Sequence, residues 1–401
     1  MNLKSDSVEN YSINSICIVN AHQIIPEFGG VERVCKILQD GFLQNDISVC
    51  SYFIEKSTFL RENEYEILNP QKIYCEENIQ QLCDICLKRN VQVLLCQTYV
   101  GEQLQLCIEV RKRLPIKLVY TFHRNPIANL KEYDDFKDKT LIKYSGRTSK
   151  FLANCKLSIG YLYFLIRNTM SNQVYDCYDY DELDAFVTLS PSYKSYFVKH
   201  VANLYKRKFY SIYNPVRIEQ NKSFYKKKKQ ILFVGRLTYQ KRLDRLFLMW
   251  RSIQKQLPDW SLFILGEGDY AKEYKSLSQK LNLKNVAFVG NVSPFEYYKE
   301  SSIICMTSSY EGLPMVLIEA QSYGCVPVAY NSFGSLKDII QNQYNGLIIP
   351  AFNENKYIKG VVSLAKNEKT LNIMSENSIA SVEKFSDKEI IKQWIEMFKQ
   401  L

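Results

Sequence analysis

Short apolar runs alternate with helix-length amphipathic segments along nearly the whole of this 401-residue chain. Runs rich in Val, Ile, Leu and Phe are typical of strands buried on both faces, and intervening helices predict that such strands are parallel. The predicted strands of the first half are Ser15–Asn20, Ser48–Phe53, Val91–Cys96, Lys117–Phe122 and Ala185–Ser190. Those of the second half are Gln230–Val234, Ser261–Leu265, Val286–Val289, Ile303–Met306, Val326–Ala329 and Gly346–Ile349. The pattern therefore predicts an α/β protein with parallel sheets.

The length predicts two consecutive doubly wound domains, because 401 residues exceed what one ordinary core encloses. The boundary is expected between the turn dipeptide Asn214-Pro215 and the strand that begins at Gln230. The run Lys226–Lys229 lies there, and we interpret it as a solvated linker. Ser386 and Glu389 form a capping box that predicts a closing helix. The apolar face of this helix, which must pack on another element, is Ile390, Ile391, Trp394, Ile395 and Phe398.

Composition favours a soluble, globular protein, since apolar residues make up 46% of the chain and charged residues 23%. No apolar run reaches the roughly 18 residues that span a bilayer. The opening stretch Met1–Asn14 is polar and lacks the apolar core of a signal peptide. The 12 cysteines lie mostly in apolar stretches, as expected in a reducing compartment. Because the pair Cys83 and Cys86 has no second pair to complete a zinc site, no metal is predicted.

The net charge of +10 is unevenly distributed. The stretch Arg111–Met170 holds 13 Lys and Arg residues against four Asp and Glu residues, with aromatic and aliphatic residues among them. Two interpretations stay open: a solvated face, or a surface for anionic lipid headgroups or a phosphate-bearing acceptor. Nucleic acid is disfavoured, because no nucleic-acid-binding motif accompanies the charge. We expect a cytoplasmic protein that can attach peripherally to the inner face of the plasma membrane.

The segment after the predicted strand Ile303–Met306 has the pattern of an anion site. A helix is predicted there, with Pro314 in its first turn and Gly324 at its end. A helix that begins directly after a parallel strand points its free N–H groups into the crevice where ligands of such sheets bind. Glu311 precedes this helix and Glu319 lies inside it. Because a carboxylate accepts from two vicinal hydroxyls at once, each glutamate suits a sugar or ribose diol.

Two cations follow the first strand of the second half. Arg236 and Lys241 are predicted to lie near the same helix start, where they can neutralise a bound anion. In this role they can replace a metal held by an Asp-x-Asp motif. The sequence Asp179-Tyr180-Asp181 has that spacing, but it lies in a polar segment and is interpreted as solvated acids.

These motifs resemble those of the retaining GT-B glycosyltransferases of group 1, also called glycosyltransferase family 4. The segment 311–330, EGLPMVLIEAQSYGCVPVAY, resembles the E-x7-E region of that family. Further similar segments are Phe28–Val34, Phe233–Arg242, Ile264–Asp269, Val286–Asn291 and Phe385–Phe398. The resemblance covers essentially the whole chain and is weaker between residues 40 and 205, where acceptor-binding domains normally differ. It implies two facing Rossmann-like domains with the C-terminal helix crossing back to the first: an acceptor domain, 1–217 with 385–401, and a nucleotide-sugar domain, 218–384.

The resemblance also implies roles for individual residues. Arg236 and Lys241 contact the donor diphosphate, Glu311 the transferred sugar, and Glu319 the ribose. His123 ends a predicted strand and contacts sugar or acceptor, although His-Arg stands here in place of the His-Asp of many members. The catalytic residues implied are His123, Arg236, Lys241 and Glu311. The donor-binding residues implied are Gly29, Gly30, Gly235, Arg236, Lys241, Glu267, Asn291, Glu311, Gly312, Leu313, Pro314 and Glu319.

The function implied is retaining transfer of a hexose-type sugar from a nucleotide-diphosphate-sugar, UDP-sugar favoured, to a glycan acceptor. The acceptor is expected to be lipid-linked and to belong to bacterial surface polysaccharide or glycoconjugate synthesis, with no cofactor and no metal. Two alternatives stay open: an inactive nucleotide-sugar-binding subunit, and a phosphorylase or disaccharide synthase on the same fold. A dehydrogenase is disfavoured, because Gly266-Glu267-Gly268 lacks the third glycine of the dinucleotide fingerprint, where Ala271 stands.

Overall fold

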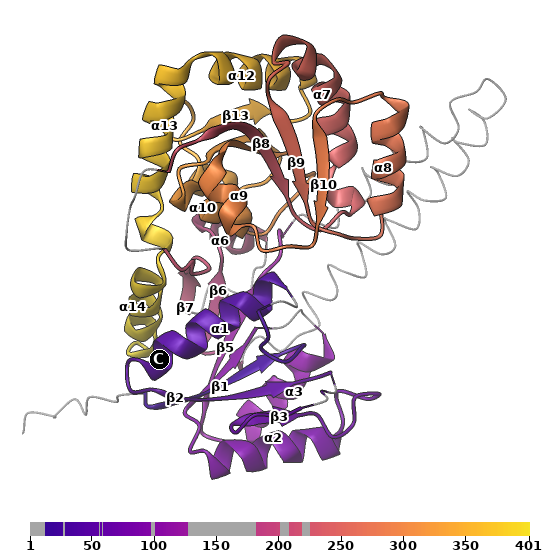
Figure 1. Cartoon of the computed structure of the whole chain (residues 1–401). Helices are drawn as coiled ribbons and strands as arrows, with labels where there is room; N and C mark the ends of the chain where they lie inside the picture. The colour runs from indigo at the N-terminus through magenta and orange to yellow at the C-terminus, as the bar shows by residue number, and fades with distance from the viewer. Residues whose placement is uncertain are drawn as a thin grey trace, which may run out of the picture.

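The structure is a computed structural model that describes residues 13–26, 29–55, 57, 59–97, 101–126, 182–200, 208–218 and 225–401. It forms two α/β lobes, one from each half of the chain (Figure 1). The basic stretch Arg111–Met170 is described only as far as residue 126, and Asp179-Tyr180-Asp181 lies outside the described residues. No helix in the described ranges is both long and apolar enough to cross a membrane.

The first lobe is built on a parallel sheet, which in the described part of the chain has seven strands in the order β3-β2-β1-β4-β5-β6-β7. The strands are β1 (Ser15–Asn20), β2 (Ser48–Phe53), β3 (Glu64–Glu66), β4 (Val93–Cys96), β5 (Lys117–Phe122), β6 (Ala185–Thr188) and β7 (Lys208–Ser211). The helices described are α1 (Gly30–Leu43), α2 (Glu76–Lys88), α3 (Glu102–Arg113) and α6 (Pro191–His200). Neighbouring residues of β1 pack in opposite cores, Cys17 with α2 and α3, and Ile18 with α1, so both faces are covered.

The second lobe has the same architecture, with six parallel strands in the order β10-β9-β8-β11-β12-β13 among the described residues. The strands are β8 (Lys228–Val234), β9 (Ser261–Leu265), β10 (Val286–Gly290), β11 (Ser301–Met306), β12 (Val326–Asn331) and β13 (Leu347–Pro350). The α-helices are α7 (Leu243–Gln256), α8 (Ala271–Lys280), α9 (Phe295–Glu300), α10 (Met315–Ser322), α11 (Leu336–Ile339), α12 (Glu354–Lys366) and α13 (Glu368–Ser381). Short 3-10 turns η3 (Tyr239–Lys241) and η4 (Glu383–Phe385) complete the lobe. Along β8, Ile231 and Leu232 again enter opposite cores.

The last helix, α14 (Asp387–Phe398), returns to the first lobe and packs along α1 (Figure 1). Its buried face joins the core on the α1 side of the first sheet, and the rings of Phe42 and Phe398 lie 5.5 Å apart between centroids. The Glu389 N–H donates to the Ser386 hydroxyl at 3.3 Å, which confirms the predicted cap. Two parallel-sheet lobes joined by such a helix confirm the predicted GT-B fold.

Three of the four lysines of Lys226–Lys229 are solvated as predicted, but Lys227 is not, and the run leads into a strand instead of forming a linker throughout. Strand β8 begins at Lys228, and the half-buried Lys227 donates from Nζ to the carbonyls of Tyr298 at 2.8 Å and Tyr323 at 2.6 Å. Tyr298 belongs to α9, and Tyr323 follows the last residue of α10, so the ammonium satisfies carbonyl groups near two helix ends. Burial lowers the pKa of Lys227.

Candidate active site between the two lobes

The carboxyl ends of three second-lobe strands converge through close backbone contacts. The Gly235 N–H after β8 donates to the carbonyl of Leu265 at 3.0 Å, and the Gly266 N–H after β9 donates to the carbonyl of Gly290 at 2.7 Å. A Cβ atom on Gly266, where φ is +129°, would lie 2.1 Å from the Gly235 oxygen. Glycine is therefore required at position 266 so that strand ends can approach, a role unrelated to dinucleotide binding.

Lys241 and Glu311 are brought together at this edge. Lys241 ends η3, and its Nζ lies 2.7 Å from Glu311 Oε1. The pair is largely withdrawn from water, since the side chains are 19% and 9% exposed. Hydrogen bonds join the two loops: the Gln240 amide donates to the Tyr310 carbonyl at 2.7 Å, and the Ser309 N–H to the Gln240 carbonyl at 2.9 Å. The loops hold one cation and one carboxylate in fixed positions before α10.

Arg236 follows Gly235 at the same edge. Its side chain is exposed, and the described part of the chain supplies no hydrogen-bond or ion-pair partner for it. A Cβ on Gly235 would lie 3.5 Å from Cε of Lys241. The Lys241 side chain therefore passes beside the backbone that carries Arg236. Glu267 is also exposed, and its Oε1 lies 3.4 Å from where a Cβ on Gly290 would be.

Helix α10 begins at Met315, so Pro314 is the N-cap residue rather than part of the first turn as predicted. Gly324, with φ +74°, follows the end of the helix as predicted. Gly312, Leu313 and Pro314 form the turn that leads into α10. A Cβ on Gly312 would lie 2.4 Å from the carbonyl oxygen of His123, so the backbones of the two lobes meet here.

His123 follows β5 and reaches the cleft from the first lobe. Its Nε2 contacts Oε1 of Gln97, which follows β4, while its Nδ1 is buried and has no hydrogen-bond partner among the described residues. Burial lowers the pKa of His123 to about 4. The ring is therefore neutral near pH 7, and donation from Nε2 to Gln97 leaves the Nδ1 lone pair available. Sequence reasoning missed Gln97, although a polar residue directly after a buried strand is a usable signal.

Tyr193, in α6 of the first lobe, is a second residue that sequence reasoning missed. Its hydroxyl lies 2.8 Å from the carbonyl oxygens of Glu311 and of Gly312, and its single proton is shared between these two acceptors. The Ser335 hydroxyl also donates to the Gly312 carbonyl, at 2.5 Å. Burial is the main cause that raises the pKa of Tyr193 to about 12, so the phenol keeps its proton. Tyr193 thus fixes the backbone that carries Glu311.

Replacing Tyr193 with phenylalanine is expected to lower kcat for sugar transfer by about tenfold, the effect of losing one buried hydrogen bond that holds a catalytic loop. Steady-state kinetics with saturating donor measure the loss. Tyr196→Phe on the same helix is the matched control and should leave kcat unchanged. Equal rates for Tyr193→Phe and the wild type would contradict the positioning role.

Glu319, inside α10, is held from two sides. Its Oε1 accepts from Arg33 Nη1 of α1 at 2.7 Å, and its Oε2 accepts from the Tyr298 hydroxyl at 3.1 Å. A cavity of about 440 Å³ lies beside it between the lobes, lined also by Asn291 and Phe295. The structure therefore brings the predicted Glu319 and Asn291 to one cavity. Burial, followed by the charge of Glu319, raises the pKa of Tyr298.

Gly29 and Gly30 lie at the start of α1, on the first-lobe side. A Cβ on Gly29 would meet Oε2 of Glu32 at 2.5 Å, whereas nothing lies within 4 Å of a Cβ on Gly30. Gly29 thus makes room for the carboxylate of Glu32, and open space adjoins Gly30. In the loop before Gly29, Nδ1 of His22 lies 2.9 Å from Oε2 of Glu55.

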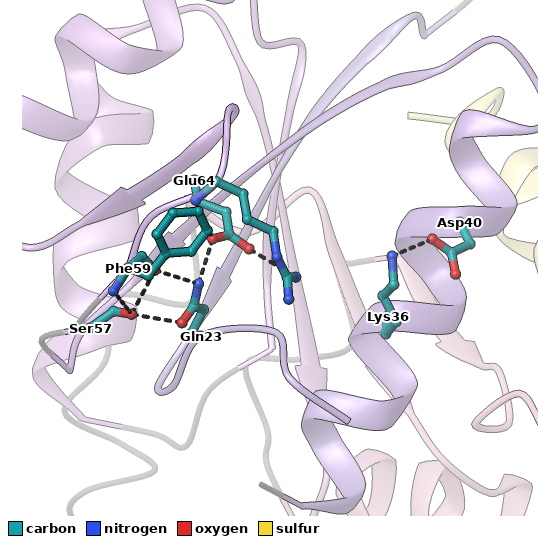
Figure 2. A network of polar contacts seen from close by, with 7 residues as sticks. Gln23, Lys36, Asp40, Ser57, Phe59 and Glu64 are labelled. Carbon is teal, nitrogen blue, oxygen red and sulfur yellow. Dashed lines mark hydrogen bonds and ion pairs between the residues drawn. The ribbon is translucent and has the colours of Figure 1, made fainter. Parts of the chain in front are cut away.

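A polar network fixes the loops after β1 and β2 (Figure 2). The Gln23 amide donates to Oε2 of the buried Glu64 at 2.6 Å and to the Phe59 carbonyl at 2.9 Å, and Ser57 donates to Gln23 Oε1 at 2.7 Å. Figure 2 also shows Lys36 paired with Asp40 on α1. These contacts stiffen the first-lobe loops that lie at the carboxyl edge of the sheet.

The chain is similar to known proteins in both sequence and fold. Residues 216–381 match the family model described as glycosyl transferases group 1. An uncharacterized glycosyltransferase of Haemophilus influenzae is 32% identical over 53% of this chain and 60% of its own length. The amylovoran biosynthesis glycosyltransferase AmsD of Erwinia amylovora is 33% identical over 43% of this chain and 48% of its own length. The matches thus span about half of these relatives.

A more distant relative and a solved structure extend the comparison. The GalNAc-alpha-(1->4)-GalNAc-alpha-(1->3)-diNAcBac-PP-undecaprenol alpha-1,4-N-acetyl-D-galactosaminyltransferase of Campylobacter jejuni is 24% identical over 55% of this chain and 62% of its own length. The Anabaena protein HepE, solved in complex with UDP, superposes with a TM-score of 0.69 at 14% identity, over 96% of this chain and all of that one. Residues 216–381 of this chain thus resemble the group 1 glycosyltransferases, and the chain as a whole shares its fold with HepE.

Proposed function

We propose that this protein transfers a hexose-type sugar from a UDP-sugar to a glycan acceptor with retention of anomeric configuration. The observation that carries the proposal is the Lys241–Glu311 pair, 2.7 Å apart in front of α10 and beside the Gly312–His123 contact. One cation, one carboxylate and a helix start converge where the lobes meet. A leaving diphosphate and a sugar hydroxyl group need these three features together.

In the proposed reaction, Arg236, Lys241 and the N–H groups at the start of α10 stabilise the diphosphate. An acceptor hydroxyl forms a bond to the anomeric carbon on the face from which the diphosphate departs. The bond from that carbon to the diphosphate oxygen breaks, its electron pair leaves with UDP, and the acceptor proton passes to a leaving phosphate oxygen. Glu311 and His123 orient the sugar, so positioning and electrostatics supply the rate enhancement.

The proposal also assigns roles to the residues that bind the donor nucleotide. Glu319 accepts from the ribose, Asn291 and Glu267 lie toward the base, and Gly235 and Leu313 shape the path between them. Support for uridine comes from HepE, which was solved with UDP, and from the cavity that Asn291 and Glu319 share. The nucleotide-sugar domain is proposed to span residues 218–384, and the acceptor domain 1–217 with 385–401.

The acceptor is proposed to be a lipid-linked saccharide used in bacterial surface polysaccharide or glycoconjugate synthesis. The relative from Campylobacter jejuni is named for an undecaprenol diphosphate-linked saccharide, and AmsD for amylovoran biosynthesis. The basic stretch Arg111–Met170 suits both the diphosphate of such an acceptor and an anionic membrane surface on which the protein rests.

A screen of nucleotide-sugars by thermal shift, followed by analysis of the anomeric bond in the product, tests the proposal. A UDP-sugar is expected to raise the melting temperature, and the product bond should keep the donor's configuration. An inverted product would contradict retention. Donor binding without transfer to any saccharide or to water would favour an inactive nucleotide-sugar-binding subunit, and product formation from a free sugar acceptor would favour a disaccharide synthase.

Sugar transfer is expected to continue at an unchanged rate in excess EDTA, because Arg236 and Lys241 supply the positive charge that a divalent cation supplies elsewhere. Initial rates with EDTA and with added Mn²⁺ measure this. A strict Mn²⁺ requirement would instead point to a carboxylate-bound metal such as Asp179-Tyr180-Asp181 could hold.

A further inference from the structure

One ion pair crosses from the first lobe to the nucleotide side of the second. Arg33, in the first turns of α1, donates from Nη1 to Oε1 of Glu319 at 2.7 Å, across 286 positions of sequence. The two side chains differ in environment: Arg33 is 39% exposed, whereas Glu319 is 5% exposed. The carboxylate therefore belongs to the interior of the second lobe, and the guanidinium reaches it from the edge of the first.

Glu319 keeps acceptor capacity although both of its oxygens have partners. An ionised carboxylate offers about four lone-pair positions. Arg33 and the Tyr298 hydroxyl occupy one position on each oxygen. Among the contacts that the described residues make, one position on each oxygen remains, which is the number that two vicinal hydroxyls need. The cavity of about 440 Å³ that Glu319 and Arg33 both line provides the space for such a diol.

We propose that Arg33 is a positioning residue that holds the Glu319 carboxylate, from the opposite lobe, in the orientation that receives the ribose of the nucleotide. This role rests on the proposed function. Its consequence is that ribose recognition, which resides in the second lobe, depends on the first lobe being closed against it.

The other two cations that line the cavity, Lys36 and Arg217, both pair with Asp40. Lys36 Nζ lies 2.7 Å from Asp40 Oδ1, and Arg217 contacts the other oxygen of the same carboxylate. Arg33 is the cavity cation that pairs with Glu319 in the described part of the chain. A planar guanidinium pairs with the charge of a carboxylate and also restricts its orientation. The ammonium of a lysine acts mainly as a point charge and restricts the orientation less.

The test uses the full chain and two probes, UDP and 2′-deoxy-UDP, with affinities measured by titration calorimetry. The wild type should bind UDP more tightly than 2′-deoxy-UDP. Arg33→Ala should lower the affinity for UDP by about tenfold, the scale of one charge-assisted contact. It should also reduce the preference for UDP over 2′-deoxy-UDP. The affinity of Arg33→Lys for UDP should lie between those of the wild type and of Arg33→Ala. Arg89→Ala, which removes a first-lobe arginine that donates to the Tyr65 hydroxyl at 2.6 Å and does not line the cavity, is the matched control and should bind both probes like the wild type.

A double-mutant cycle separates positioning from direct contact. If Arg33 acts through Glu319, the double variant Arg33→Ala, Glu319→Gln should bind UDP no worse than Glu319→Gln alone. Additive losses would overturn the positioning role, because Arg33 would then contact the nucleotide itself. Unchanged UDP affinity and unchanged ribose preference in a folded Arg33→Ala, checked by its melting temperature, would also overturn it. Failure of the wild type to bind UDP at all would overturn the proposed donor, and this role with it.

Discussion

Replacing Lys241 with methionine is expected to lower kcat by about 10² to 10³-fold, the loss typical when one preorganised charge-stabilising group is removed from an active site. Methionine keeps an unbranched apolar chain in the space of the lysine stem but removes the charge. The diphosphate would then leave without the positive charge of Lys241, and Glu311, 9% exposed, would lose its partner at 2.7 Å. Steady-state rates of sugar transfer at saturating donor measure the effect.

The unpaired carboxylate is a second possible cause of the loss, and one further variant separates the two. Adding Glu311→Gln to Lys241→Met removes the buried unpaired charge, which by itself is costly. If the ammonium acts on the diphosphate, the double variant should be no faster than Lys241→Met, and it can be slower because Glu311→Gln also removes a proposed sugar contact. Recovery of kcat in the double variant would instead assign the loss to Glu311. A Lys241→Met enzyme within tenfold of the wild type would contradict the diphosphate role.

The four strands whose bounds the sequence predicts best lie inside the two sheets, with a neighbouring strand on each side. The predicted bounds of β1, β2, β5 and β9 match the structure residue for residue. The strands β3 (Glu64–Glu66) and β7 (Lys208–Ser211) were missed. Both are short edge strands of the first sheet with charged residues, and such strands carry no continuous apolar run.

The site residues that were predicted and those that were missed also differ in which lobe their contacts come from. Glu311, Lys241 and Glu319 follow strand ends or lie in one helix of the second lobe, so local motifs were enough to find them. Tyr193 and Arg33 act on that lobe from the first one. Their contacts depend on how the two lobes face each other, which neither periodicity nor motif spacing encodes. Arg33 lies within the segment Phe28–Val34, in which only Gly29 and Gly30 were predicted as site residues.

Replacing Gly312 with alanine is expected to lower kcat by at least about 100-fold while UDP affinity falls by no more than in Arg33→Ala. The added methyl group would lie 2.4 Å from the His123 carbonyl oxygen, and both sides of that contact are backbone, so no side-chain rotation relieves it. The lobes must therefore separate locally, and a displacement on the order of 1 Å between reacting groups costs about 100-fold. Most proposed nucleotide contacts lie within the second lobe and remain.

Gly41→Ala is the matched control for this prediction. Its methyl group would also lie 2.4 Å from a neighbour, but that neighbour is the Ile391 side chain in the seam between α1 and α14, away from the cleft. Gly41→Ala should therefore lower the melting temperature and leave kcat of the folded enzyme close to that of the wild type. Calorimetry with UDP, melting curves and initial rates on the same preparations distinguish the two variants. A Gly312→Ala enzyme that turns over at the wild-type rate would mean that sugar transfer does not require His123 and Gly312 to meet.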